Sequence, residues 1–245
     1  MIRTFFTGCA VALAMISGTS QAALAADGGT TREPGLDIVG FNGRGYFFGI
    51  EQFGQRPRTG IPYAEIRIYD LRTDREIDRS PFVYDETAKI PEGHTIEDAI
   101  DRARRAVYLD ARRVIKYLTL VPRGRTVVPK DGKAAKALQI SAPGLSGLLT
   151  LETFPLDAPG CKGVKTVGFV LKLANDKGVS EVHRDTKMPK GRGCPVDYDI
   201  RSASIYLPHP EADALAVVIG ARQGGRDSGD IHYTVVGHFY DHRKK

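Results

Sequence analysis

Apolar and polar residues alternate along several short stretches of the chain, which is typical of half-buried β-strands. The most regular alternation covers residues 63–71. Residues 38–41 and 46–50 flank Asn42-Gly43, a dipeptide that favours the positive φ angles of a tight hairpin turn. The pattern therefore predicts a hairpin followed by a half-buried strand in the first part of the chain.

Residues 95–118 follow a different period. Their apolar residues recur at steps of three and four, which places them on one stripe of an amphipathic helix. Thr95 is placed to cap this helix, and Asp98 follows three residues later, as in a capping box. Acidic residues come first and basic residues last, in the order that complements the helix dipole. We expect Pro122 and Gly124 to end the helix.

From residue 137 onward the strand pattern returns. Residues 214–219 are apolar at every position, which indicates a central strand covered on both faces. The expected strands of this part are 148–154, 167–173, 201–207, 214–219 and 231–240. The sequence therefore predicts an α+β fold, mainly β, with antiparallel sheets, arranged as a sandwich or a partial blade, and one long amphipathic helix. We expect a single β-rich domain over residues 37–245, made of a hairpin region at 37–90, the helix at 95–118 and a β-rich part at 137–241.

The first 25 residues have the layout of a secretory signal peptide. Arg3 is followed by an apolar run from Phe5 to Ile16, and Ala23-Leu24-Ala25 is a small-residue cleavage site. The run is shorter than the roughly 18 residues that a membrane anchor needs. We expect cleavage near Ala25, export to the periplasm, no transmembrane anchor in the mature chain and a flexible lead-in at 26–36.

Cysteine usage agrees with export. Cleavage would remove Cys9 and leave Cys161 and Cys194, and an even count in an oxidising compartment indicates a disulfide. The alternative is two separate buried thiols. Neither cysteine has the close cysteine or histidine neighbour of a zinc site.

The chain has 35 Lys and Arg against 29 Asp and Glu, and the signal segment contains only one of these residues, Arg3. This modest positive charge favours an anionic surface or an acidic envelope protein as partner. It does not indicate nucleic acid, since bases and acids are interleaved and tryptophan is absent. Five arginines lie on the predicted helix, and they form either a solvated face with pairs such as Asp101–Arg105 or a docking surface: Arg102, Arg104, Arg105, Arg112 and Arg113.

One short segment before Cys194 is rich in cations. Arg184, Lys187, Lys190 and Arg192 crowd a loop that the disulfide would hold, so they are candidates for binding an anionic group. The alternative is a polar loop with local salt bridges. The same segment contains His183-Arg184-Asp185, the tripeptide of the kinase catalytic loop. However, Lys190 stands where a kinase has asparagine, and no phosphate-covering glycine loop accompanies it.

No assembled catalytic or metal motif is found. His232, His238 and His242 share a strand face, but at about 3.3 Å per residue they are too far apart for a single zinc ion. We therefore predict no catalytic residue, no metal ligand and no cofactor. If the protein is an enzyme, its candidate acids and bases are His183 with Asp185, or Glu51 with Asp70.

Three segments resemble known proteins. The stretch from Gly40 through Asp70, with GFNGRGYFFGIE and then PYAEIRIYDLRTD, resembles one blade of a β-propeller, although one blade cannot close a propeller. Together with VHRDTKMPKGRGCPVDYDI at 182–200 and ARQGGRDSGDIHYTVVG at 221–237, it makes the chain similar to a family of bacterial predicted secreted proteins of unknown function. The resemblance implies export and a shared fold, and it assigns no activity.

Three classes of function remain open at this point. The first is a non-catalytic binding or protein-interaction module of the cell envelope, favoured by the basic surface elements. The second is a periplasmic hydrolase with dispersed catalytic residues. The third is a structural envelope component. A pocket with a titratable pair would favour the enzyme, and an exposed basic or apolar patch would favour the interaction module.

Overall fold

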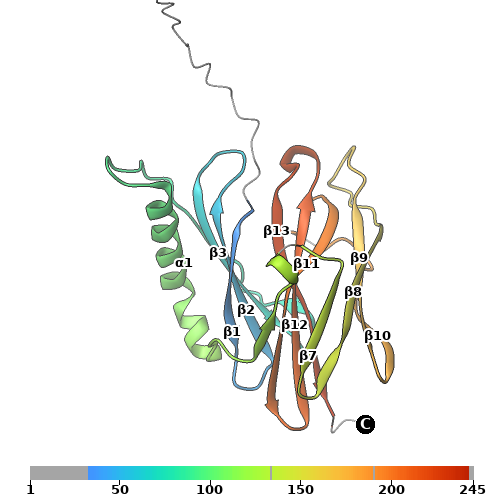
Figure 1. Cartoon of the computed structure of the whole chain (residues 1–245). Coiled ribbons are helices and arrows are strands. Elements are labelled where there is room, and N and C mark those ends of the chain that lie inside the picture. The colour runs from blue at the N-terminus through green and yellow to red at the C-terminus, as the bar shows by residue number, and fades with distance from the viewer. Residues whose placement is uncertain (1–32, 133, 190, 243–245) are drawn as a thin grey trace, which may run out of the picture. The chain divides into compact units, whose positions relative to one another are not determined.

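The strands assemble into three sheets that stack face to face, with the helix on the outer face of the first sheet (Figure 1). The structure is a computed structural model and describes residues 33–132, 134–189 and 191–242. The expected signal peptide and residues 26–32 of the expected lead-in lie outside these ranges. All strand pairs named below are antiparallel. The predicted α+β class, mainly β with antiparallel sheets and one long helix, is confirmed in the described part of the chain.

Sheet A is built from the first part of the chain. Its order is β1-β2-β3-β4, and β5 also pairs with β3. Its strands are β1 (Gly35–Phe41), β2 (Phe47–Gln55), β3 (Pro62–Asp70), β4 (Arg75–Glu76) and β5 (Phe82–Asp85), and helix α1 (Ile96–Leu118) follows. β1 begins inside the stretch that we expected to be a flexible lead-in, because Leu36 packs against the core between sheets A and B.

Sheets B and C come from the rest of the chain. Sheet B has the order β13-β12-β11-β6, from β6 (Arg125–Val127), β11 (Pro195–His209), β12 (Ala212–Gln223) and β13 (Ile231–Asp241). Sheet C has the order β10-β9-β8-β7, from β7 (Ala137–Ala142), β8 (Leu145–Pro155), β9 (Val167–Asn175) and β10 (Gly178–Arg184). Two short 3₁₀ turns, Lys130–Gly132 and Gly225–Asp227, complete the described elements.

The core has three layers that follow from the alternation within the strands. Sheet B lies in the middle, and the two faces of β12 belong to different layers. Ala214, Ala216 and Val218 face sheet A, whereas Leu215 and Val217 face sheet C. The third layer lies between sheet A and α1. The central strand predicted from residues 214–219 is therefore confirmed.

Helix α1 forms where its sequence signals place it and ends at Leu118, as expected, but the residues that stop it differ from those expected. Thr95 and Asp98 form a complete capping box at the start of the helix. Its C-terminal cap is Thr119, a non-glycine residue in the left-handed region (φ 54°), whose backbone N–H donates to the carbonyls of Ile115 and Lys116. Pro122 and Gly124 lie beyond this cap, so they do not end the helix themselves.

The segment before Cys194 differs from the expected loop. Its first part, including His183 and Arg184, belongs to β10, the edge strand of sheet C. Most of its residues are exposed, so the strand is held by pairing with β9 rather than by an apolar face. This pairing is what brings His183 to the side of sheet B.

Candidate functional site

A cavity of about 250 Å³ opens at the edge of sheet B, where all three sheets contribute side chains. Sheet A contributes Arg67 from β3 and the turn around Asp74. Sheet C contributes His183, and the following loop contributes Arg192. The back wall is β13, including Tyr233. Since these residues come from distant parts of the sequence, only the stacking of the sheets brings them together.

A chain of buried ion pairs links the sheets beside this cavity. The Nδ1 atom of His183 lies 2.5 Å from Oδ2 of Asp74, and its Nε2 atom lies 3.0 Å from Oδ1 of Asp185. Asp185 also accepts a hydrogen bond from Nη1 of Arg192 at 2.7 Å and one from the backbone N–H of Phe169 at 3.1 Å. We call Asp74, His183, Asp185 and Arg192 the junction network.

Burial makes this network electrostatically strong. The Asp185 side chain is only 1% exposed and that of Arg192 only 8%. Both cations also lie near aromatic rings. His183 stacks on Phe169 with ring centroids 4.9 Å apart, and the Arg192 guanidinium lies 5.2 Å from the same ring. A buried charge is stable only when it is paired, so each member of the network depends on the others.

The pairing changes the proton affinity of His183. Burial alone would lower its pKa, but the hydrogen bonds and charges of Asp185 and Asp74 outweigh burial and raise the pKa to about 9. Burial would likewise raise the pKa of Asp185, and His183 and Arg192 outweigh it, so this pKa is lowered. His183 is therefore an imidazolium at neutral pH, and both of its ring nitrogens contact carboxylates.

Asp74 holds the three sheets together. It adopts the left-handed region (φ 52°), which aspartate tolerates better than most residues. Besides contacting His183 on sheet C, it accepts a hydrogen bond at 2.8 Å from the backbone N–H of Gly237 on β13. Asp74 itself lies in the turn after β3, so one carboxylate connects sheets A, B and C.

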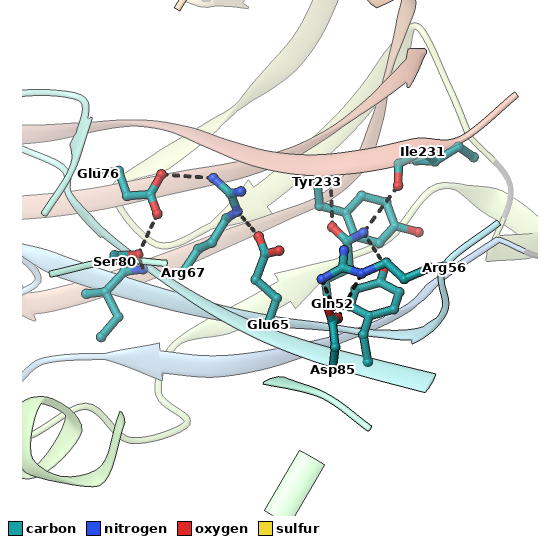
Figure 2. Close-up of polar contacts among 11 residues, drawn as sticks. Gln52, Arg56, Glu65, Arg67, Glu76, Ser80, Asp85, Ile231 and Tyr233 are labelled. Carbon is teal, nitrogen blue, oxygen red and sulfur yellow. Dashed lines mark hydrogen bonds and ion pairs between the residues drawn. The ribbon is translucent and has the colours of Figure 1, made fainter. Parts of the chain in front are cut away.

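A second side chain of sheet A satisfies the open edge of β13. Gln52 accepts a hydrogen bond from the backbone N–H of Tyr233 at 2.9 Å and donates to the Ile231 carbonyl at 3.2 Å (Figure 2). It also donates to the Tyr63 hydroxyl at 2.7 Å. β13 is an edge strand, whose outward N–H and C=O groups have no neighbouring strand. Gln52 and Asp74 take the place of that strand.

Most of the charges at the cavity are paired, with one exception. Arg67 lies between Glu65 and Glu76 and contacts both carboxylates (Figure 2). Arg75 lines the cavity and is exposed, and its side chain has no hydrogen bond or ion pair with the described residues. Four cations line the cavity: Arg67, Arg75, Arg192 and charged His183. All of them except Arg75 contact carboxylates, which belong to Glu65, Asp74, Glu76 and Asp185. Arg75 is therefore the one lining cation without a carboxylate partner among the described residues.

The four cations predicted to bind an anion are not equivalent. Arg192 points inward to Asp185 and lines the cavity. Arg184 pairs with Glu181 on the exposed side of β10, with 2.6 Å between Nη2 and Oε2. Lys187 is exposed, and Lys190 lies outside the described residues. Anion binding by this group stays a prediction, and Arg192 is the member that the cavity includes.

The structure also shows the contacts of the four acids and bases that an enzyme could use. His183 and Asp185 contact each other, as described above. Glu51 is completely buried and accepts two hydrogen bonds from Arg104 of α1, at 3.0 and 2.7 Å, while burial raises its pKa. Asp70 pairs with Arg72 at the surface, 2.5 Å from Oδ2 to Nη2. Glu51 and Asp70 therefore have separate partners and do not form a dyad with each other.

The sequence did not single out Asp74 or the two arginines Arg67 and Arg75. Asp74 follows the alternating strand at a turn, where acidic residues are common for conformational reasons. Arg67 lies on the polar side of that alternation. Sheet B covers this side of the strand, where Tyr69 and Leu71 are buried. A charged residue at a position that another sheet covers is the signal that could have identified Arg67.

The three histidines near the end of the chain do not gather at one site. His232 and His238 lie on β13, and His242 follows it and contacts Asp213, 2.9 Å from Nε2 to Oδ2. Among the described residues, no group of three or more His, Cys, Asp or Glu side chains is placed to hold a metal ion. No helix in those ranges is both long and apolar enough to cross a membrane.

The predicted disulfide is confirmed. Cys161, in the β8–β9 connection, is bonded to Cys194, which directly precedes β11, with the two Cα atoms 5.5 Å apart. The backbone N–H of Cys194 donates to Gln223 on β12 at 2.8 Å. The bond therefore fastens a loop of sheet C to sheet B, two residues after Arg192.

Reduction of this disulfide should destabilise the protein clearly. The bond closes a loop between residues separated by 33 positions, and the chain-entropy model gives a loss of about 3–4 kcal/mol when such a loop opens. For a chain of this size we expect the melting temperature to fall by about 10 °C. Melting with and without dithiothreitol measures this shift. The Cys161→Ser/Cys194→Ser variant is the control, because the reductant should not lower its melting temperature further; equal melting of oxidised and reduced protein would contradict the expectation.

Comparison with known proteins gives one result. No curated protein and no solved structure is significantly similar to this chain. The model of the family described as "Predicted secreted protein (DUF2259)" matches residues 49–238. These residues include β3 to β12, α1 and every member of the junction network. The match covers well over half of the sequence, and the chain therefore belongs to this family of predicted secreted proteins of unknown function.

Proposed function

We propose that this secreted protein is a non-catalytic binding module that takes a small organic anion into the cavity beside the junction network. The proposal includes export to the periplasm after cleavage near Ala25. A cavity of about 250 Å³ is at the small end of ligand sites, so it suits a compact molecule or one group of a larger one. Its position between three sheets makes the site rigid, since each wall belongs to a different sheet.

The unpaired charge of Arg75 carries the proposal. Three of the four lining cations contact carboxylates, whereas Arg75 has no partner among the described residues. A guanidinium without a partner can donate two parallel hydrogen bonds to a carboxylate or phosphate. The rings of Tyr69 and Tyr233 add apolar walls, which suits an organic anion better than a simple inorganic one.

The hydrolase alternative has weaker support from the same contacts. A general base needs a nitrogen or carboxylate that can reach a substrate proton. Both nitrogens of His183 contact carboxylates, and Asp185 is occupied by Arg192, His183 and the backbone of Phe169. The contacts of the network favour rigidity and fixed charge, which serve binding.

Ligand binding can be tested directly by calorimetry and thermal shift on the mature protein. The probes are citrate, benzoate and inorganic phosphate, with glucose as the uncharged control. We expect an anion to raise the melting temperature, because a ligand at a hundred times its Kd stabilises the folded state by about 2.7 kcal/mol. Arg75→Gln should weaken binding by about 10- to 100-fold, the value of one charge-assisted hydrogen-bonded pair.

Arg72→Gln is the matched control. Arg72 lies on the same turn and is also exposed, but it pairs with Asp70 and does not line the cavity. Equal weakening by both substitutions would show that only the general positive charge matters. If none of the anions shifted the melting temperature, the proposal would be wrong, and the structural envelope component would become the better interpretation.

A further inference from the structure

Helix α1 presents a second surface, far along the chain from the cavity, that the protein leaves uncovered. Its inner stripe packs completely against sheet A through Ala103, Val107 and Ala111. On the opposite side Leu109 is 62% exposed, and in the last turn of the helix Tyr117 is 85% exposed. A helix that buries one apolar stripe does not need large apolar side chains on its outer face, so these two call for an explanation.

Cations surround these exposed apolar residues. Arg105, Arg112 and Lys116 lie three or four positions from Leu109 or from one another, so they occupy the same face of the helix. Arg113 lies four positions from both Leu109 and Tyr117. All four cations are exposed, and Asp110 is the single acid between Arg105 and Tyr117. We call Arg105, Leu109, Arg112, Arg113, Lys116 and Tyr117 the outer face of α1.

The pairing pattern separates this face from the rest of the helix. Arg102 and Arg104 turn towards the protein and pair with Glu86 and Glu51. The spacing suggests a pair between Asp101 and Arg105, but it is not formed. None of the four cations on the outer face forms an ion pair with the described residues. They are therefore available to a partner of opposite charge.

We propose that the outer face of α1 binds the surface of an anionic phospholipid bilayer. This inference goes beyond the proposed binding of a small anion and does not depend on it. The face spans about 18 Å along the helix, at 1.5 Å per residue, so it can reach several headgroups at once. Arginine pairs with phosphate through two parallel hydrogen bonds, while exposed leucine and tyrosine side chains enter the interface between headgroups and acyl chains.

The combination of residues favours lipid over an acidic protein. The hollow beside Leu109, which Arg105, Tyr108 and Arg112 help to line, is shallow and open to solvent. Cations around exposed Leu109 and Tyr117 therefore match a flat surface with negative charge above an apolar layer better than they match a peptide. Four cations near an anionic leaflet give association that is reversible and sensitive to salt. We therefore expect the protein to bind the bilayer surface peripherally and to exchange between the bound and the free state.

Vesicle co-sedimentation of the mature protein tests the inference. The probes are vesicles of one part phosphatidylglycerol to two parts phosphatidylcholine, and vesicles of phosphatidylcholine alone. We expect binding only to the anionic vesicles, and its loss at high salt. Arg112→Gln/Arg113→Gln should lower the partition coefficient by about 30-fold, and Leu109→Ser, which keeps the charge, by about tenfold.

The matched control removes the same charge elsewhere. Arg222 and Arg226 are exposed and lie at the other end of the chain, on β12 and in the turn after it, so Arg222→Gln/Arg226→Gln should retain vesicle binding. Equal loss in both double variants, or no binding to anionic vesicles by a folded protein, would overturn the inference. Vesicle binding by Leu109→Ser that equals binding by the original chain would also overturn it. Charge alone would then account for the binding, and an acidic protein would explain the outer face of α1 as well as a bilayer does. Melting curves of each variant establish that the fold is intact.

Discussion

Replacing Asp185 with asparagine should lower the free energy of unfolding by about 3–5 kcal/mol, the largest effect that we expect from one polar substitution in this protein. The carboxylate is 1% exposed and contacts His183, Arg192 and the backbone N–H of Phe169. Asparagine has nearly the same shape but no charge, so it would leave two buried cations without their shared partner. Denaturation by urea, monitored by circular dichroism, measures the difference in unfolding free energy between this variant and the original chain.

Glu181→Gln provides the comparison on the same strand. Glu181 also pairs with an arginine, Arg184, but both side chains are nearly half exposed. Exposed pairs contribute about 0–1 kcal/mol, so this variant should unfold almost like the original chain. If the two variants lost similar amounts of stability, the junction network would have no special role in holding the sheets together.

The contribution of His183 to stability should depend on pH, and it should decrease as the pH rises. Its pKa is about 9 in the folded protein, against 6.5 for the ordinary side chain, so the folded state holds the proton more tightly. The stabilisation is then fully present below pH 6.5 and is lost as the pH rises through 9. A shift of this size corresponds to about 3 kcal/mol.

The measurement compares the original chain with His183→Gln at several pH values. The difference in unfolding free energy should be largest near pH 6 and should shrink towards pH 9. His94→Gln is the control, because His94 is exposed next to the helix and its substitution should change the free energy by less than about 0.5 kcal/mol throughout. A His183 difference that stayed constant between pH 6.5 and 9 would show that its charge does not stabilise the fold.

Much of the local structure could be predicted from the sequence, because local signals determine it. Thr95 and Asp98 mark the start of α1. The first hairpin forms at Asn42 as expected, but the positive φ angle lies at Gly45 and not at Asn42-Gly43, because the Asn42 side chain accepts hydrogen bonds from the backbone N–H groups of Tyr46 and Phe47 and shapes a longer turn. The apolar residues at 214–219 identified a strand that is covered on both faces. In each case the signal lies within a few residues of the structure that it predicts.

The candidate site could not be predicted in the same way, because it depends on contacts between distant residues. Asp74 and His183 are 109 positions apart, and no pattern in either segment refers to the other. β10 was missed because its residues are mostly polar and exposed, as suits an edge strand. The turn Asn175-Asp176-Lys177-Gly178 between β9 and β10 was its available signal, since the Asn175 side chain accepts a hydrogen bond from the Lys177 N–H at 2.9 Å.

The way sheet A covers the edge of β13 also has a consequence for biogenesis. Gln52 and Asp74 precede their partners Tyr233 and Gly237 by 181 and 163 positions. In a chain that leaves an export channel with its N-terminus first, sheet A is therefore available before the strand that needs it. Without sheet A, the backbone of β13 would offer free pairing groups to a neighbouring molecule. Damage to sheet A should therefore lead to intermolecular strand pairing and aggregation, even though β13 itself is unchanged.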